Sequence, residues 1–261
     1  MSNSCDSAAS VVMTQLRSTT MVAYAASGEL VLNDGARVSY DRLLVAVGRR
    51  ARTDGLDCAA AGVELAQNGT VEVDQHLRTS NPRIWAAGDV TGGPQFTHTA
   101  GVNGSLAAGN AVLGLRRSVD PVVPRVTYTA PEVAAVGVST AELLPDRHTV
   151  LRWDHRHVDR AITDADTAGF STLVVDGRGR LVGATVVGPR AGETLGELTL
   201  AVRKGLTVRD VAGTTHAYPT YNDGVWKPAV EQVRDRLGRP PIGPVLHAAA
   251  GLRRLWLDRR R

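Results

Sequence analysis

The pattern of the chain changes at Pro121 and Pro124, and the segment after this boundary constrains the fold most strongly. Four short apolar or alternating segments, typical of β-strands, precede two longer segments with helical periodicity. The predicted strands are 133–138, 149–153, 171–175 and 181–187, with a turn at 176–179, and the predicted helices are 191–204 and 221–237. Strands followed by helices predict an α+β domain over residues 121–237, in which helices cover an antiparallel sheet.

The residues before this boundary have an α/β pattern. We predict a hairpin at 29–40, strands at 43–47, 70–74 and 84–87, and a buried helix at 97–115 with Thr97 as its N-cap. Asn33-Asp34-Gly35 is the turn signal of the hairpin. The continuous apolar run at 43–47 indicates a strand buried on both faces. Residues 1–28 have little pattern, and we expect a ragged N-terminal segment.

Charge excludes a dedicated nucleic-acid surface. The formal net charge is +4, and the tail 234–261 holds eight arginines against two aspartates, which leaves the rest of the chain slightly acidic. We therefore expect no nucleic-acid partner. Within the basic tail 238–261, residues 246–257 predict an amphipathic helix, but its apolar side is too shallow for us to expect membrane contact.

Cysteine usage and hydropathy indicate the compartment. Cys5 and Cys58 form neither a CxxC pair nor a Cys/His cluster, so we predict no metal site. No apolar run approaches the ~18 residues that a membrane span requires. Residues 1–10 lack the basic and apolar regions of a signal peptide. These features predict a soluble cytoplasmic protein.

One segment carries the residues of a ligand site. Gly88 and Asp89 end the predicted strand 84–87, and ligands of open α/β sheets bind at the carboxyl ends of strands. A carboxylate there can accept hydrogen bonds from the hydroxyls of a sugar or ribityl chain. Gln95–His98 open the next helix, whose N-terminal amides can hold an electron-rich ring edge. The plain alternative is a strand-end turn, and the phosphate-binding patterns GxGxxG and GxxxxGK[ST] are absent.

Four stretches carry a resemblance to a known family. They are Leu43-Leu-Val-Ala-Val-Gly-Arg-Arg50, residues 79–90, Tyr128-Thr-Ala-Pro-Glu-Val-Ala-Ala-Val-Gly137 and His216-Ala-Tyr-Pro-Thr-Tyr-Asn-Asp223. In order, they resemble the end of the NAD domain, the second FAD motif, the start of the dimerisation domain and the C-terminal active-site motif of class I pyridine nucleotide–disulfide oxidoreductases. Within that family the chain looks most like mercuric reductase and dihydrolipoamide dehydrogenase.

The resemblance implies the family's architecture and chemistry. It implies an α/β remnant of a FAD/NAD(P)-binding domain at 29–120, followed by an α+β dimerisation domain at 121–237. In that family NAD(P)H reduces FAD, FAD reduces an active-site disulfide, and the disulfide reduces the substrate. The family works as a homodimer, which residues 121–237 would form here.

The resemblance also implies site residues. The cofactor-binding residues would be Gly88, Asp89, Gln95, Phe96, Thr97 and His98. Tyr218 stands where many members have a catalytic histidine, and Asp223 where they have the glutamate that orients it. A tyrosine, with a pKa of about 10, handles a proton poorly near neutral pH, so it would donate a hydrogen bond or line a ligand pocket. His216 is a candidate base, or else a histidine bonded to nearby backbone.

Several family motifs are absent from these 261 residues. They are the N-terminal FAD fingerprint, the CxxxxC redox pair and the NAD fingerprint. We therefore expect the C-terminal portion of a truncated FAD-dependent NAD(P)H oxidoreductase, acting on a disulfide or metal ion and inactive as this chain alone. The alternatives are a non-catalytic dimerisation or binding module, or half of a split flavoenzyme whose companion chain supplies the N-terminal half. Without its partner strands, segment 43–47 is expected to expose its apolar faces.

Overall fold

The computed structural model describes residues 22–26, 28–32, 34–44, 46 and 48–259, without the side chains of residues 22–26. Cys5 and most of the predicted ragged segment lie outside the described residues. The chain divides into two units, the first ending at Arg50 and the second beginning at Ala51.

The first unit is a small antiparallel sheet. Its strands are β1 (Val22–Ala26), β2 (Glu29–Leu32) and β3 (Arg37–Ser39), in the order β1-β2-β3. The β2–β3 hairpin pairs Glu29 with Ser39. Its turn is closed by the Gly35 amide, which donates to the Leu32 carbonyl at 3.0 Å. The predicted hairpin at 29–40 is therefore confirmed.

The predicted buried strand at 43–47 is wrong for the residues that are described. Residues 43, 44 and 46 are not in a strand, and Leu44 is 88% exposed. An apolar run of this kind forms a central strand only when neighbouring strands pair with both of its edges. No described strand pairs with it, and its described residues 43, 44 and 46 are exposed, as expected for a strand without partners.

Residues 51–96 form turns, loops and one short 3-10 helix (Asp89–Thr91), and isolated bridges join them. The predicted strands at 70–74 and 84–87 are wrong, because each is reduced to an isolated bridge, Leu65 with Val71 and Arg78 with Trp85. Backbone bonds still tie these segments to their neighbours, as where the Val71 amide donates to the Val90 carbonyl at 2.8 Å. The segments lie where strands were predicted but have no sheet to join.

Helix α1 (Thr97–Leu113) confirms the predicted helix, with two corrections. The N-cap is Phe96 and not Thr97, and no side chain caps the helix. The helix is also less buried than predicted. Only Thr99, Ala107 and Asn110 are buried, and Val112 is exposed. Its apolar residues have too few packing partners within the described residues to be covered.

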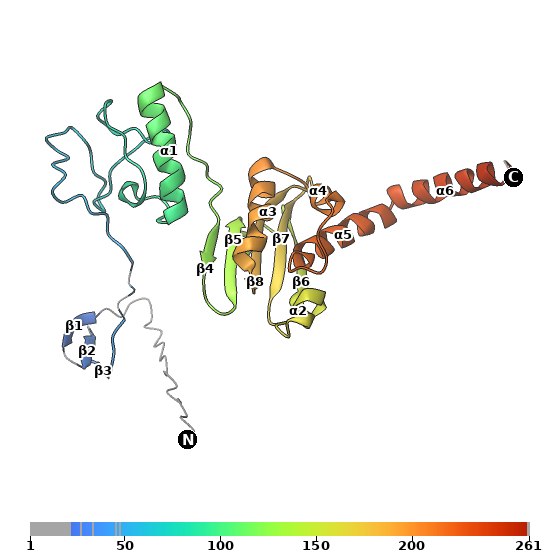
Figure 1. Ribbon diagram of the computed structural model, residues 1–261, viewed down its shortest axis with the longest axis horizontal. Helices are drawn as coiled ribbons and strands as arrows, with labels where there is room; N and C mark the ends of the chain where they lie inside the picture. The colour runs from blue at the N-terminus through green and yellow to red at the C-terminus, as the bar shows by residue number, and fades with distance from the viewer. Residues whose placement is uncertain (1–21, 27, 33, 45, 47, 260–261) are drawn as a thin grey trace, which may run out of the picture. The chain divides into compact units, whose positions relative to one another are not determined.

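Residues 125–188 form a five-stranded antiparallel sheet in the order β4-β5-β8-β7-β6 (Figure 1). The strands are β4 (Arg125–Thr127), β5 (Glu132–Gly137), β6 (His148–Asp154), β7 (Phe170–Asp176) and β8 (Leu181–Gly188). All four predicted strands are confirmed, whereas β4 is too short for its alternation to be recognised. At the predicted turn 176–179, the Gly179 amide donates to the Asp176 carbonyl at 2.9 Å.

Helices cover this sheet. They are α3 (Ala191–Lys204), α4 (Val208–Gly213) and α5 (Asp223–Gly238), with the short α2 (Asp159–Thr163) after β6. Figure 1 shows α3 lying along β5 and β8. Leu195 and Leu198 of α3 are fully buried in the shared core, and burial of each contributes about 1.5–3 kcal/mol. The structure has the predicted mixture of helices and strands, and the predicted α+β domain, an antiparallel sheet covered by helices, is confirmed.

The basic tail forms α6 (Ile242–Asp258), which begins four residues before the predicted helix at 246–257. Leu252 and Leu255 are exposed on it, and so is Val245. In the part of the chain that the structure describes, no helix combines the length and the apolar character needed to cross a membrane.

Candidate functional site

The Gly88-Asp89 turn packs against the start of α1. Gly88 has φ 83°, which glycine adopts without steric cost, and a Cβ added to it would lie 3.2 Å from the Ala100 Cβ. The backbone therefore packs closely on the first turn of α1, and a side chain at position 88 would be crowded against Ala100. The Thr91 hydroxyl donates to the Gly88 carbonyl at 2.8 Å and fixes the turn, from which the half-buried Asp89 projects.

The N-terminus of α1 keeps its amides available. The first intrahelical bond runs from the Ala100 amide to the Phe96 carbonyl, 2.9 Å, so the amides of residues 97–99 have no carbonyl one turn earlier in the helix. The hydroxyl oxygen of Thr99 is buried without a hydrogen-bond partner among the described residues. The predicted helix start at Gln95–His98 thus adjoins the Gly88 turn.

His98 is exposed, but its ring contacts two other parts of the chain. Its ring stacks on Phe96 with centroids 5.1 Å apart, and its Nε2 lies 3.0 Å from the Pro124 carbonyl oxygen. A neutral or charged imidazole can satisfy that carbonyl only by donating from Nε2. The ring of His98, one of the six predicted cofactor-binding residues, is therefore hydrogen-bonded to the Pro124 carbonyl.

The predicted pair of Tyr218 and Asp223 is not joined by a hydrogen bond among the described residues. The Tyr218 hydroxyl donates instead to Asp159 Oδ2 at 2.7 Å, and the side chain lies at the surface, with the residue 68% exposed. Asp223, the first residue of α5, is 2% exposed, and its Oδ2 has no partner in the described part of the chain. Burial raises the pKa of Asp223, and the Lys227 ammonium opposes that shift.

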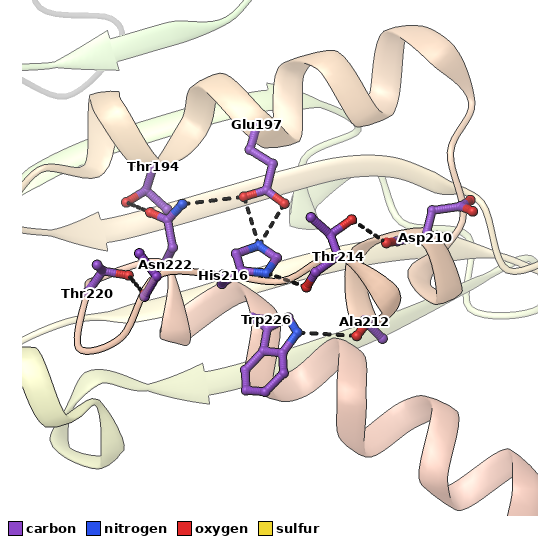
Figure 2. A network of polar contacts seen from close by, with 10 residues as sticks. Thr194, Glu197, Asp210, Ala212, Thr214, His216, Thr220, Asn222 and Trp226 are labelled. Carbon is purple, nitrogen blue, oxygen red and sulfur yellow. Dashed lines mark hydrogen bonds and ion pairs between the residues drawn. The ribbon is translucent and has the colours of Figure 1, made fainter.

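His216 is held by a network of polar contacts, which Figure 2 shows. Its Nδ1 lies 2.9 Å from the Thr214 carbonyl, and its Nε2 lies 2.9 Å and 3.1 Å from the two carboxylate oxygens of Glu197. Both ring nitrogens face acceptors, and only an imidazolium can donate to both. Both nitrogens are thus engaged by the chain, and the contact with Glu197 is an ion pair when the ring is protonated.

The network extends to the start of α5. Asn222 donates from Nδ2 to Glu197 Oε2 at 3.3 Å and accepts from the Thr194 hydroxyl at 3.2 Å. The ring of Trp226 lies 6.0 Å from that of His216. These contacts fasten both ends of the segment that carries Tyr218 to helix α3. They hold the loop in place, so the position of the Tyr218 backbone is fixed relative to α3.

A third group, centred on His155, was not predicted from the sequence. This histidine is fully buried and bonded through Nε2 to the Ser171 hydroxyl, 3.0 Å away. Three glycines line its ring: a Cβ on Gly188 would lie 2.6 Å from its Nδ1, one on Gly169 would lie 2.8 Å from it, and one on Gly224 would lie 3.1 Å from Nε2. Burial lowers the pKa of His155, opposed by the carboxylates of Asp154 and Asp166.

This burial predicts a pH dependence of stability. The unfolded chain takes up the His155 proton near the ordinary value of 6.5, whereas the folded chain takes it up only at lower pH. Between these two values the unfolded state binds more protons, so the free energy of unfolding falls as pH drops below 6.5. We expect urea denaturation of the unaltered chain to show this loss of free energy of unfolding. The variant His155→Gln should not show it. Equal slopes in the two proteins would contradict the assignment.

No signal in the sequence marked these partners. Glu197 and Asp159 lie 19 and 59 positions from the residues that they contact, so no motif spacing relates them. His155 lies in the continuous polar run 154–157, which carries no recognisable motif. Among the described residues no group of three or more His, Cys, Asp or Glu side chains could hold a metal ion.

Two family models match the chain. The pyridine nucleotide-disulphide oxidoreductase model matches residues 11–104, and the dimerisation domain of the same family matches residues 123–229. Mercuric reductase from Streptomyces lividans is 41% identical over 188 residues, which are 70% of this chain and 40% of that protein. Dihydrolipoyl dehydrogenase from Geobacillus stearothermophilus is 37% identical over 223 residues, 84% of this chain and 45% of that protein. The chain spans less than half the length of either relative.

A solved structure supports the same assignment. The crystal structure of LpdA from Mycobacterium tuberculosis matches with a TM-score of 0.75 and 25% identity, over 82% of this chain and 48% of that one. Fold and sequence together define a nucleotide-dependent oxidoreductase fold with its own dimerisation domain. The chain belongs to the pyridine nucleotide–disulphide oxidoreductases, a family of FAD- and NAD(P)-dependent enzymes.

Proposed function

We propose that this chain supplies the C-terminal portion of a FAD-dependent NAD(P)H oxidoreductase that reduces a disulfide or a metal ion. The observation that carries the proposal is the Gly88-Asp89 turn packed on the uncapped first turn of α1. A carboxylate on a turn that packs against the start of a helix fits a ligand that has both hydroxyls and an electron-rich ring edge. The ribityl chain and the pyrimidine edge of a flavin have these two features.

FAD, when bound, supplies a two-electron carrier between the nicotinamide and the acceptor. In the proposed site Asp89 accepts hydrogen bonds from the ribityl hydroxyls, and the amides at the start of α1 donate to the ring edge. The segment Gln95–His98 shapes that edge of the site. With a disulfide as acceptor, NAD(P)H and one proton yield NAD(P)⁺ and two thiols.

The proposed active-site residues come from the other domain. Tyr218 would meet the substrate, Asp223 would stand behind it as a buried carboxyl group, and His216 would anchor the loop. We propose that residues 29–120 are the partial FAD/NAD(P)-binding domain, 121–237 the dimerisation domain and 238–261 a basic tail. Activity would require the FAD fingerprint and the redox cysteine pair, which these 261 residues do not contain. A companion chain or a further part of the same protein would supply them.

Flavin binding distinguishes this proposal from a non-catalytic dimerisation module. FAD would be mixed with the full chain alone, and with the chain plus the separately expressed N-terminal half of a mercuric reductase. We expect weak or no binding to the chain alone, and bound, NADPH-reducible flavin in the mixture. A mixture that binds no more flavin than the N-terminal half by itself would favour the non-catalytic module.

We also propose that the chain forms a homodimer through residues 121–237. Sedimentation velocity should then give a dimer for the full chain. Truncation after Leu237 should leave the dimer intact, since α6 lies beyond the dimerisation domain that the family model matches at 123–229. If the truncated chain were a monomer, part of the dimer interface would lie on α6.

A further inference from the structure

The hydroxyl proton of Tyr218 is already used in a hydrogen bond. The hydroxyl donates to Asp159 Oδ2 at 2.7 Å, a distance typical of a hydrogen bond to an ionised acceptor. Asp159 is the first residue of α2, and Tyr218 lies in the loop before α5. Two separate elements therefore meet at this bond, and both residues are exposed. The bond joins the two residues where a substrate could reach them.

We propose that Asp159 is the positioning residue of Tyr218, and that it turns the phenolic oxygen into a hydrogen-bond acceptor for the substrate. The site would then select substrates with a cationic or hydrogen-bond-donating group next to the reacting bond, and disfavour anionic ones. This inference rests on the proposed function only in that the substrate meets Tyr218. The bond between the two side chains and its electrostatic consequence stand independently of any activity.

The phenol has a fixed number of donor and acceptor positions. It carries one donor and two lone pairs, so a tyrosine that donates to a carboxylate can only accept from a third group. The nearby Asp159 carboxylate raises the pKa of Tyr218, and Asp223 adds to the shift. The phenol therefore stays protonated with its proton directed at Asp159. What Tyr218 offers to a substrate is lone-pair density on the oxygen.

The surrounding charges point in the same direction. The charges of Asp159 and Asp223 both raise the pKa of Tyr218. The nearby basic groups contact other residues: Arg160 donates to Asp164 at 2.8 Å, and His216 lies 2.9 Å from Glu197. Lys227 acts on the buried Asp223. A negative local field with an acceptor oxygen favours a cationic or donating group over a carboxylate or phosphate.

The neighbouring Tyr221 provides a matched control. Its hydroxyl donates to Asp164 Oδ2 at 3.1 Å, so the domain contains a second tyrosine–aspartate pair. Tyr221 is buried, whereas Tyr218 is exposed. The variants Asp159→Asn and Asp164→Asn each remove one charge without removing a side-chain oxygen that can accept. Asp159→Asn should change the titration of Tyr218 only, and Asp164→Asn that of Tyr221 only.

The first test titrates the phenols in the full chain, labelled with carbon-13 at the tyrosine Cζ. Tyr218→Phe and Tyr221→Phe assign the two signals. In Asp159→Asn we expect Tyr218 to titrate at lower pH than in the unaltered chain, while Tyr221 is unchanged and reports an intact fold. Asp164→Asn should leave Tyr218 unchanged. A Tyr218 titration that is the same in Asp159→Asn and in the unaltered chain would overturn the positioning role.

The second test uses the chain mixed with the N-terminal half of a mercuric reductase. Cystamine, a disulfide with two ammonium groups, should have a lower KM than dithiodipropionate, which has two carboxylates. Asp159→Asn should reduce this preference about threefold, as expected for loss of one exposed charge. An unchanged preference would overturn the selection of cationic substrates. If the mixture had no reductase activity, the proposed function would fail, and the titration alone would decide the role of Asp159.

Discussion

Replacement of Gly188 by alanine is expected to destabilise the dimerisation domain by about 3 kcal/mol or more, the size of effect that overpacking a buried site produces. A Cβ at this position would lie 2.6 Å from Nδ1 of His155 and 2.7 Å from its Cε1. His155 cannot yield, because Ser171 holds it and Gly169 and Gly224 pack closely around it. The φ of 151° at Gly188 adds backbone strain for any L-residue.

Urea denaturation followed by circular dichroism measures this effect. Gly177→Ala is the control, because Gly177 lies in the exposed β7–β8 turn and an added Cβ would have nothing within 4 Å. We expect the control to unfold at nearly the same urea concentration as the unaltered chain. Gly188→Ala should unfold at a much lower urea concentration or be insoluble. If both variants unfolded alike, the packing around His155 would not limit the stability of the domain.

Gly88→Ala is expected to weaken flavin binding by the reconstituted mixture about tenfold or more, a loss of about 1.4 kcal/mol or more in binding free energy. The φ of 83° at Gly88 is unfavourable for alanine, and the added Cβ would lie 3.2 Å from the Ala100 Cβ. The turn would have to move away from α1. Asp89 and the helix amides would then no longer face the same ligand.

The control for this variant is Gly93→Ala, at an exposed position five residues further along the chain. An added Cβ at Gly93 meets nothing within 4 Å, and the backbone there does not require glycine. Fluorescence titration with FAD would compare the two variants in the presence of the N-terminal half. Equal affinities of Gly88→Ala and the unaltered chain would show that flavin does not depend on this turn.

The hairpin at 29–40 and the antiparallel sheet after residue 121 could be predicted from the sequence, whereas the structure of segments 43–47, 70–74 and 84–87 could not. Strands such as β7 and β8 pair with each other across a four-residue turn, so their alternation and the turn signal suffice. The run at 43–47 was predicted from apolar content alone. A central strand depends on partners on both sides, and none of the described strands pairs with it, so Leu44 is exposed.

The candidate site shows the same division. Gly88, Asp89 and the start of α1 lie close in sequence, and local signals found them. Asp159 and Glu197 reach Tyr218 and His216 from distant elements, and only the packing of α2 and α3 brings them there. The family resemblance implied Asp223 as the partner of Tyr218, whereas the hydrogen bond is made by Asp159.

The most direct test of the proposed flavin site is a visible absorption spectrum of the chain with added FAD, recorded with and without the N-terminal half after removal of free flavin. We expect a colourless chain alone and a retained flavin band in the mixture, larger than the N-terminal half retains by itself. A mixture that retains no additional flavin would contradict the claim that residues 88–98 form part of a flavin site.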